Sequence, residues 1–231
     1  MSSAIRSKLH SLADPVRAAG ALRFFKTGPG EYGEGDKFLG VTVPLVRSLV
    51  RESDALGEGD VLSFLHSEWH EERLLALLVL VRRFERRADE RERIAKLYVA
   101  NTRWINNWDL VDTSAPQILG AWLLGRDRAL LGKLAASTDL WEQRIAVLAT
   151  FAFIRAGEFA DTLGLCERFL THRHDLMHKA CGWMLREVGK RDISALRMFL
   201  DNHATRMPRT MLRYAIEKLA PGERQDYLGR R

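Results

Sequence analysis

One spacing constrains the fold of this chain more than any other feature. Residues that each open an apolar stretch follow one another at intervals of 35, 36, 35 and 34, and they are Arg73, Trp108, Arg144, Lys179 and Arg213. A fixed period of this length, with two helices in each unit, is typical of an α-solenoid. Tetratricopeptide repeats share the period, but their Trp, Leu-Gly and Pro consensus is missing here. We therefore expect an all-α protein, an α-solenoid of HEAT-like helical repeats with a concave basic face, forming one domain over 1–231.

The spacing of apolar residues predicts one helix after another. They recur every three or four residues in 44–52, 60–67, 70–85, 90–103, 116–125, 127–136, 140–156, 158–170, 175–189, 192–203 and 207–219. Two short helices are expected before these segments, over 3–12 and 15–26.

Local signals refine where these helices begin. Asp14 and Asp139 stand where N-caps are expected, and Pro116 is expected to begin a new helix. The arginine-rich stretch 82–87 is interleaved with acidic residues, which predicts an ordinary surface helix. Only Gly40–Val46 resembles a strand, and it is too short to found a sheet.

The composition points to a globular protein with an anionic partner. Hydrophobic residues at 46% and charged residues at 29% are ordinary for soluble globular proteins, but the net charge of +6 is not. A basic balance favours nucleic acid, and less often a membrane surface. The longest apolar runs are too short to span a bilayer, so we expect no membrane association. Cys166 and Cys181 have no CxxC spacing, which is typical of reduced core residues in a cytoplasmic protein.

Two further patterns suggest ligand sites, and both are weak. The segment Thr27–Lys37 holds four glycines, yet Gly35 is followed by Asp36 rather than by Lys and Ser or Thr. A phosphate loop needs that ending, so an ordered loop is the better interpretation. His172, His174 and His178 lie close in sequence, as do His66 and His70, but no third ligand stands at a zinc-site spacing. We expect neither a metal nor a cofactor.

The repeat places chemically useful side chains in rows. Trp108, Arg144 and Lys179 are expected side by side, with Asp112 and Trp183 one helical turn further along. Packing in the core is the alternative for tryptophans at helical spacing. Because Asp112 is hard to bury without a partner, a concave binding surface is favoured. Other cations could extend this surface or be merely solvated, and they are Arg186, Lys190, Arg206, Arg209 and Arg213.

The chain resembles the AlkD-like DNA alkylation-repair glycosylases, which are built from HEAT-like repeats. The resemblance rests on four stretches, Phe25–Gly28 with Gly35–Val41, Asn107–Asp112, Trp141–Ala146 and Lys179–Lys190. It implies that Trp108, Asp112, Arg144 and Trp183 stand at the family's active-site positions. Some relatives lack the carboxylate and lose the usual activity, whereas this sequence keeps it. The resemblance also implies a monomer that grips the damaged strand by its backbone and leaves the base in the duplex.

These residue types suit the chemistry of a charged leaving group. A purine alkylated at N3 or N7 is cationic and leaves readily, so one carboxylate suffices where glycoside hydrolysis uses two. Asp112 would stabilise charge on the deoxyribose, and the tryptophans would pack against the sugar. Arg144 would hold a phosphate, and DNA binding is expected from Arg144, Lys179, Arg186, Lys190, Arg209 and Arg213. We thus expect release of 7-methylguanine and 3-methyladenine from duplex DNA.

Two other classes of function stay open at this point. One is a non-catalytic HEAT-like module that binds nucleic acid, against which Asp112 argues because a carboxylate weakens phosphate binding. The other is a protein–protein scaffold, which is a common use of such repeats. The clustered cations argue against a scaffold.

Overall fold

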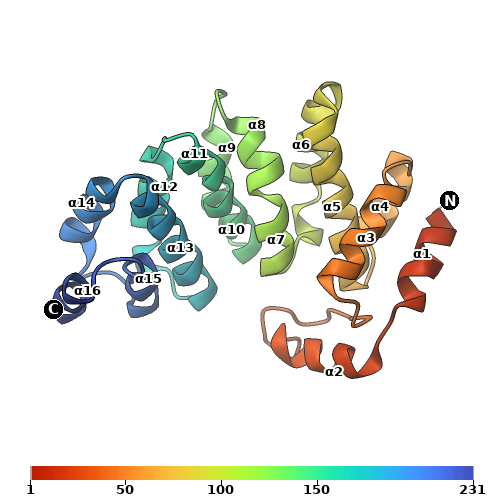
Figure 1. Ribbon diagram of the computed structural model, residues 1–231, viewed down its shortest axis with the longest axis horizontal. Helices are drawn as coiled ribbons and strands as arrows, with labels where there is room; N and C mark the ends of the chain where they lie inside the picture. Colours follow the sequence, from red (N-terminus) through yellow and green to blue (C-terminus); the bar gives the residue numbers. More distant parts are fainter. Residues whose placement is uncertain (1, 231) are drawn as a thin grey trace. The chain divides into compact units, whose positions relative to one another are not determined.

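The structure is a computed structural model that describes residues 2–230, and it confirms the all-α class. No strand occurs within these residues, and the β-type pairing found there is a single bridge between Lys37 and Trp69. The helices, drawn in Figure 1, are α1 (Ser2–Ser11), α2 (Pro15–Phe24), α3 (Val43–Ser53), α4 (Glu58–Leu65), α5 (His70–Arg86), α6 (Arg91–Ala100), α7 (Trp108–Ser114), α8 (Ala121–Leu123), α9 (Ala129–Ala135), α10 (Leu140–Ala149), α11 (Phe151–Arg155), α12 (Ala160–Arg168), α13 (Asp175–Arg191), α14 (Ile193–His203), α15 (Arg209–Ala215) and α16 (Pro221–Gly229). Short 3₁₀ turns cover Ala88–Glu90, Thr102–Trp104 and Phe169–Thr171, and a π-helical segment covers Pro116–Gly120.

The chain forms two compact units, Met1–Ile118 and Leu119–Arg231. In the N-terminal unit, α5 is the central helix and packs against α3, α4, α6 and α7. In the C-terminal unit, α13 has this role and packs against α10, α12, α14 and α15.

The two units differ in charge. Seventeen basic and seventeen acidic residues balance over 1–118, so the whole excess of +6 belongs to 119–231.

The 35-residue period corresponds to a repeated structural position. Each of its five members lies within the first five residues of a helix, and these helices are α5, α7, α10, α13 and α15. Both expected N-caps are confirmed. The side chain of Asp14 accepts hydrogen bonds from the amides of Val16 and Arg17, and that of Asp139 from the amides of Trp141 and Glu142. The α-solenoid expected from the spacing is therefore the observed fold class.

Three local expectations were wrong. Pro116 does not begin a new helix but widens a continuous helical run into a π turn, because proline lacks an N–H and its ring crowds the preceding carbonyl. Gly40–Val46 forms no strand, since α3 begins at Val43. The arginines of 82–87 do not lie on a simple surface helix. Arg83 is 4% exposed and donates to the carbonyls of Asp54 and Leu56, which ties α5 to the end of α3.

Close packing in the C-terminal unit depends on one glycine. A Cβ atom on Gly182 would stand 2.5 Å from the carbonyl oxygen of Met211 and equally close to the Cβ of Tyr214. No side chain fits at that distance, so α13 and α15 approach each other at a position that only glycine allows. This contact holds the part of α13 that carries Trp183.

Candidate functional site

Trp108 and Asp112 share one face of α7, as the sequence predicts. Trp108 is the first residue of the helix and Asp112 follows one turn later, and both side chains are half-buried. Asn107 caps the helix, because its side-chain oxygen accepts a hydrogen bond of 2.9 Å from the amide of Trp108. The indole and the carboxylate are thus held on a helix whose start is fixed by its own N-cap.

Aromatic rings from outside α7 hold the indole of Trp108. Phe25 stacks on it with ring centroids 5.3 Å apart and an interplanar angle of 18°. Phe24, at the end of α2, meets the same indole edge-on at 5.8 Å, and 64% of Phe24 is exposed. Behind Phe25 lies Phe38, stacked at 4.9 Å. One face of Trp108 is therefore covered by a buttress of rings that restricts how the indole can turn.

A buried ionic cluster lies directly beneath this buttress. The imidazole of His70 contacts Asp109 at 2.8 Å through Nε2 and Asp36 at 3.2 Å through Nδ1. Arg73 donates to the other oxygen of Asp36 at 2.6 Å, and the amide of Asn107 donates to Asp36 at 3.3 Å. We call Asp36, His70, Arg73 and Asp109 the ionic cluster. It joins the start of α5 to the start of α7.

The cluster changes the protonation of its members. Burial disfavours a charged His70, but the ion pair and hydrogen bond with Asp109 and the hydrogen bond to Asp36 prevail and raise the pKa of His70 to about 9. Burial likewise opposes the charge of Asp36, yet His70, Arg73 and Asn107 together lower its pKa. At neutral pH the cluster therefore holds an imidazolium and a guanidinium against two carboxylates.

The glycine-rich segment is an ordered loop, as expected. The carboxylates of Glu31 and Glu34 accept hydrogen bonds from the amides of Gly28 and Gly30 at 2.9 and 2.8 Å. A Cβ atom on Gly33 would stand 2.4 Å from the carbonyl oxygen of Phe25, so the loop lies tightly against the buttress. These amides already have acidic partners, which leaves this loop unsuited to hold phosphate.

Asp112 lies close to a buried tyrosine. Burial raises the pKa of Tyr98, and the nearby negative charge of Asp112 raises it further, against a lowering hydrogen bond with Ser114. The Tyr98 hydroxyl and the Ser114 hydroxyl are 2.9 Å apart, and Ser114 in turn donates to the carbonyl of Leu110. Asp112 is thus half-buried and close enough to a fully buried tyrosine for its charge to act on the hydroxyl.

In the C-terminal unit, Glu187 is the centre of the residues around Trp183. The indole N–H of Trp183 donates to Glu187 at 3.2 Å, and Lys190 contacts the same carboxylate oxygen at 2.6 Å. Arg186 contacts Glu187 at 3.7 Å and makes a close ion pair with Glu217. Arg186 and Lys190 were expected as DNA-binding cations, and the structure shows both neutralised by acidic neighbours that the sequence analysis did not consider.

Arg144 differs most from its expected surroundings. The residue is 4% exposed, and its guanidinium donates to the carbonyl of Leu176 at 2.7 Å. Because Leu176 belongs to the first turn of α13, Arg144 links α10 to α13, the two helices that carry successive positions of the 35-residue period. Arg73, at the equivalent position of an earlier repeat, is buried in the same way. The guanidinium of Arg144, expected beside Trp108 and Lys179 on a binding surface, is therefore almost entirely buried.

The other expected cations are exposed or half-exposed. Lys179 forms an ion pair of 2.8 Å with Asp175, one turn earlier in α13. Arg209 donates to the carbonyl of Leu228, and Arg206 contacts His203. Arg213 is exposed and makes no hydrogen bond or ion pair with residues 2–230. Arg213 is thus the cation of this group most accessible to a ligand.

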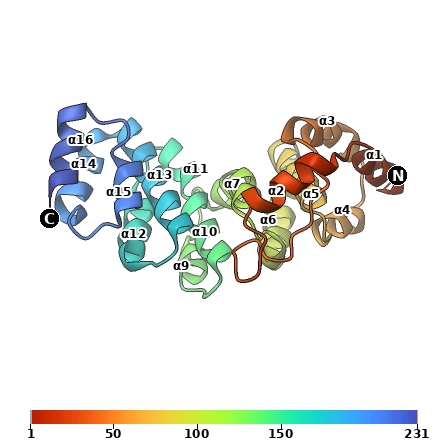
Figure 2. The ribbon, with the colours of Figure 1, turned by 90° about the horizontal axis from the view of Figure 1, so that it is seen from below.

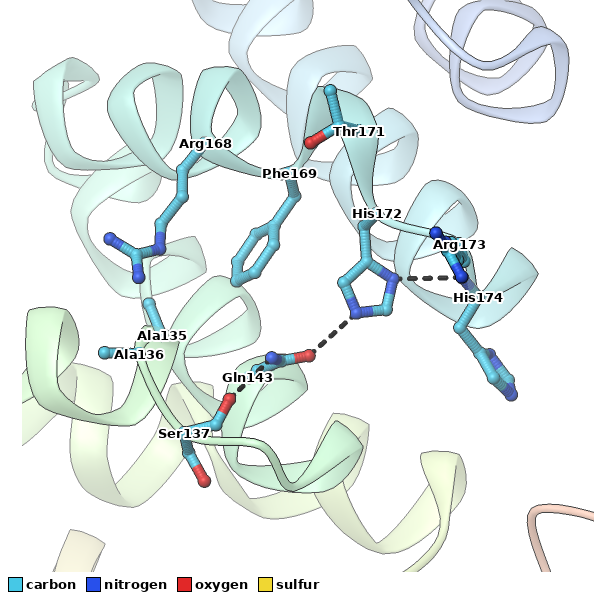
Figure 3. Close-up of a pocket in the computed structure, with 10 residues that line it drawn as sticks. All are labelled: Ala135, Ala136, Ser137, Gln143, Arg168, Phe169, Thr171, His172, Arg173 and His174. Atoms are coloured by element: carbon cyan, nitrogen blue, oxygen red, sulfur yellow. Dashed lines mark hydrogen bonds between the residues drawn. The ribbon is translucent and has the colours of Figure 1, made fainter.

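His172 and His174 line part of an open pocket of about 550 Å³ between the start of α10 and the residues before α13 (Figure 3). His172 Nδ1 accepts a hydrogen bond from the amide of His174, so Nε2 carries the proton and donates to Gln143 at 2.8 Å. Burial and the nearby His178 lower the pKa of His172. Figure 3 shows the ring of His174 turned away from that of His172. Within residues 2–230, no group of three or more His, Cys, Asp or Glu side chains is arranged to hold a metal ion.

The two cysteines are buried and unbonded, as expected, and burial raises the pKa of Cys166. No helix within residues 2–230 combines the length and apolar character that crossing a bilayer requires. Four residues of the site were not predicted as functional, and they are Phe24, Phe25, Asn107 and Glu187. Asn before Trp108 was a visible N-cap signal, and Glu187 stands at helical spacing from Trp183 and Lys190.

Comparisons with known proteins agree with this architecture. The family model described as DNA alkylation repair enzyme matches residues 5–219. A solved structure of a predicted DNA alkylation repair enzyme from Enterococcus faecalis has a TM-score of 0.69, with 16% sequence identity over 90% of this chain and 97% of that one. No curated protein sequence matches the chain.

Proposed function

The chain belongs to the DNA alkylation repair enzyme family, and from this premise we propose that it is a DNA glycosylase. It hydrolyses the N-glycosidic bond of cationic alkylated purines, chiefly 7-methylguanine and 3-methyladenine, in duplex DNA. The observation that supports this most is the pairing of Trp108 with Asp112. A half-buried carboxylate stands one turn from an indole whose far face is braced by Phe25.

Asp112 supplies the electrostatic part of the reaction. As the glycosidic bond stretches, positive charge develops on the deoxyribose, and a fixed carboxylate next to it lowers the barrier. Because Asp112 is half-buried, its charge is screened less by solvent than that of a fully exposed carboxylate. The departing purine is already cationic and leaves as a neutral base, so no general acid is required. Asp112 also orients the water that attacks the sugar.

Aromatic and basic residues position the substrate. Trp108, held by its buttress, offers a rigid surface for the sugar and attracts its cationic character. From the C-terminal unit, Trp183 has the same role and Arg144 holds a backbone phosphate. Arg144 is buried against Leu176. In this role, it therefore contacts the phosphate only through the edge of its guanidinium group. Lys179, Arg186, Lys190, Arg209 and Arg213 add contacts along the duplex, and the protein acts as a monomer.

The base stays in the duplex during the reaction. If the protein selects its substrate by how easily the glycosidic bond of the damaged base breaks, it needs no pocket that encloses a flipped purine. Lesions without a positive charge are then poor substrates, because their bases leave slowly without an acid.

Release of free methylpurine from methylated duplex DNA tests the proposal. The wild-type protein should release 7-methylguanine and 3-methyladenine but leave uracil in an otherwise identical duplex. Asp112→Asn should lower the single-turnover rate by about 10²- to 10³-fold, or about 3–4 kcal/mol in the barrier. Asp89→Asn, which removes an exposed carboxylate elsewhere in the same unit, is the control. Undiminished release by Asp112→Asn would remove Asp112 from the mechanism, and DNA binding without any release would show a non-catalytic module.

A further inference from the structure

The N-terminal unit contains a basic cavity that the proposed site does not use. It has a volume of about 370 Å³ and opens between α3, α5 and α7. Figures 1 and 2 both show α5 beside α3 and α7. We call it the arginine pocket, and the polar residues that define it are Arg47, Arg51, Arg82, Arg86, Thr113 and Gln117. Glu85 is the single carboxylate among the residues that line it.

The four arginines converge by helical spacing. Arg47 and Arg51 lie one turn apart on α3, and Arg82 and Arg86 lie one turn apart on α5. Like charges at this spacing repel each other and destabilise a helix by about 0.2–0.5 kcal/mol per pair. Of the four, the side chains of Arg47, Arg51 and Arg86 form no hydrogen bond or ion pair with any residue that the structure describes. For these three side chains, the repulsion is therefore not offset by an ion pair within residues 2–230.

Other arginines of α5 show what a structural role requires in this part of the fold. Arg83 is buried and donates to two backbone carbonyls, and Arg87, just after the helix, pairs with Asp54 and Glu90. Arg82 is intermediate, because its Nε is 3.6 Å from Asp54 yet buried without a hydrogen-bond acceptor. A buried N–H group without an acceptor is energetically unfavourable, and a ligand that supplies an acceptor removes this cost. Three of the four arginines that line the pocket therefore have no side-chain partner within residues 2–230, and the fourth, Arg82, has only a long ion pair with Asp54.

The chemistry of the lining selects a phosphate group. Guanidinium forks match phosphate oxygens and bind them in pairs of hydrogen bonds. Thr113 adds a hydroxyl and Gln117 a side-chain amide whose N–H group can donate to a phosphate oxygen, and both belong to the helical run that carries Asp112. Because 1–118 has no net charge, the cluster does not follow from general basicity. We propose that the arginine pocket binds a backbone phosphate of the DNA on which Asp112 acts, an inference that rests on the proposed function.

The test compares two double variants that remove the same charge. Arg47→Gln/Arg51→Gln changes the pocket through α3, and Arg93→Gln/Lys96→Gln changes exposed residues of α6. Binding to an undamaged duplex is measured between 50 and 200 mM salt, a range in which phosphate contacts dominate the salt dependence. Because one phosphate contact is lost, the pocket variant should reduce the slope of log K against log salt by about one, and the control should leave it unchanged. Equal slopes for both variants would overturn the proposal.

A third variant and a second ligand complete the experiment. Gln117→Glu places a carboxylate in the pocket without changing its shape, and it should also weaken binding to the duplex. If inorganic phosphate raises the melting temperature of the wild type but not of the pocket variant while the duplex slopes stay equal, the pocket binds free phosphate and the proposal fails. The salt dependence of binding is measured without any release of a base. If the pocket variant shows a smaller slope but the wild-type protein releases no methylpurine, only the proposed function is refuted.

Discussion

The imidazole Nε2 of His70 lies 2.8 Å from the carboxylate of Asp109, the residue that directly follows Trp108. Through this contact the first turn of α7 is fixed to the first residue of α5. The other imidazole nitrogen contacts Asp36, so a single histidine joins the loop after α2, α5 and α7. Substitution of this histidine should therefore alter the position of Trp108.

Stability should fall at alkaline pH through His70. Its pKa is raised from 6.5 to about 9 in the folded protein, so its stabilisation is complete below pH 6.5 and is lost as the pH rises through 9. The difference is on the order of 3 kcal/mol. Urea unfolding at pH 6 and pH 10 measures it. His70→Gln should remove most of this dependence, whereas His66→Gln, at an exposed histidine, should retain it. An unchanged pH dependence in His70→Gln would contradict the assignment.

Loss of the N-cap of α7 should affect both stability and activity. Asn107→Ala removes the acceptor for the amide of Trp108 and a hydrogen-bond donor to Asp36. We expect a loss of about 1–2 kcal/mol in the free energy of unfolding, and slower methylpurine release because the indole is less well held. Ser137→Ala, outside this unit, gives the comparison for activity. Equal release by the two variants would show that the cap does not position Trp108.

Gly182→Ala should destabilise the C-terminal unit. The added methyl group would meet the carbonyl of Met211 at 2.5 Å, which forces α13 and α15 apart at a cost of about 1–3 kcal/mol. Gly132→Ala is the matched control, because nothing lies within 4 Å of its new Cβ and the helix α9 gains about 0.5–1 kcal/mol. Thermal melting of both variants should thus show shifts of opposite sign. The same sign for both would disprove the close contact.

Glu187→Gln should strengthen DNA binding. The amide oxygen still accepts from the indole of Trp183, but the negative charge beside Arg186 and Lys190 is gone. Freed cations contact phosphates and release counterions, so affinity should rise by at least about threefold at low salt, with a steeper salt dependence. Glu167→Gln, at an exposed carboxylate of α12, is the control for net charge. Weaker binding by Glu187→Gln would show that Glu187 organises the surface rather than masking it.

Local patterns predicted the helices well, because period and capping depend on neighbours in sequence. Asp14 and Asp139 cap the helices that they were expected to cap, and Trp108 and Asp112 share a face of α7. Burial at the repeat positions was not predictable in the same way. Arg144 is withdrawn from solvent by a carbonyl of α13, and a contact 32 residues away leaves no mark in the local pattern.

The surroundings of Trp108 were missed for a related reason. Phe25 and His70 come from segments far apart in the chain, and only the folded loop after α2 brings them to α7. The acidic residues of that loop were sufficient to exclude a phosphate site from sequence alone. Their hydrogen bonds to backbone amides of the same loop were not predicted. By contrast, the ion pairs of Glu187 follow helical spacing and could have been predicted, had acidic residues been weighed together with the cations.

The uneven charge of the chain separates two traits that selection can then adjust independently. Surface substitutions in 119–231 alter the long-range attraction of the protein to a polyanion, because the entire positive surplus is carried there. The residues 1–118, which have no net charge, can retain the ionic cluster around His70 through such changes. Affinity can thus drift with the salinity of the surroundings while the geometry around one indole and one acid stays as it is.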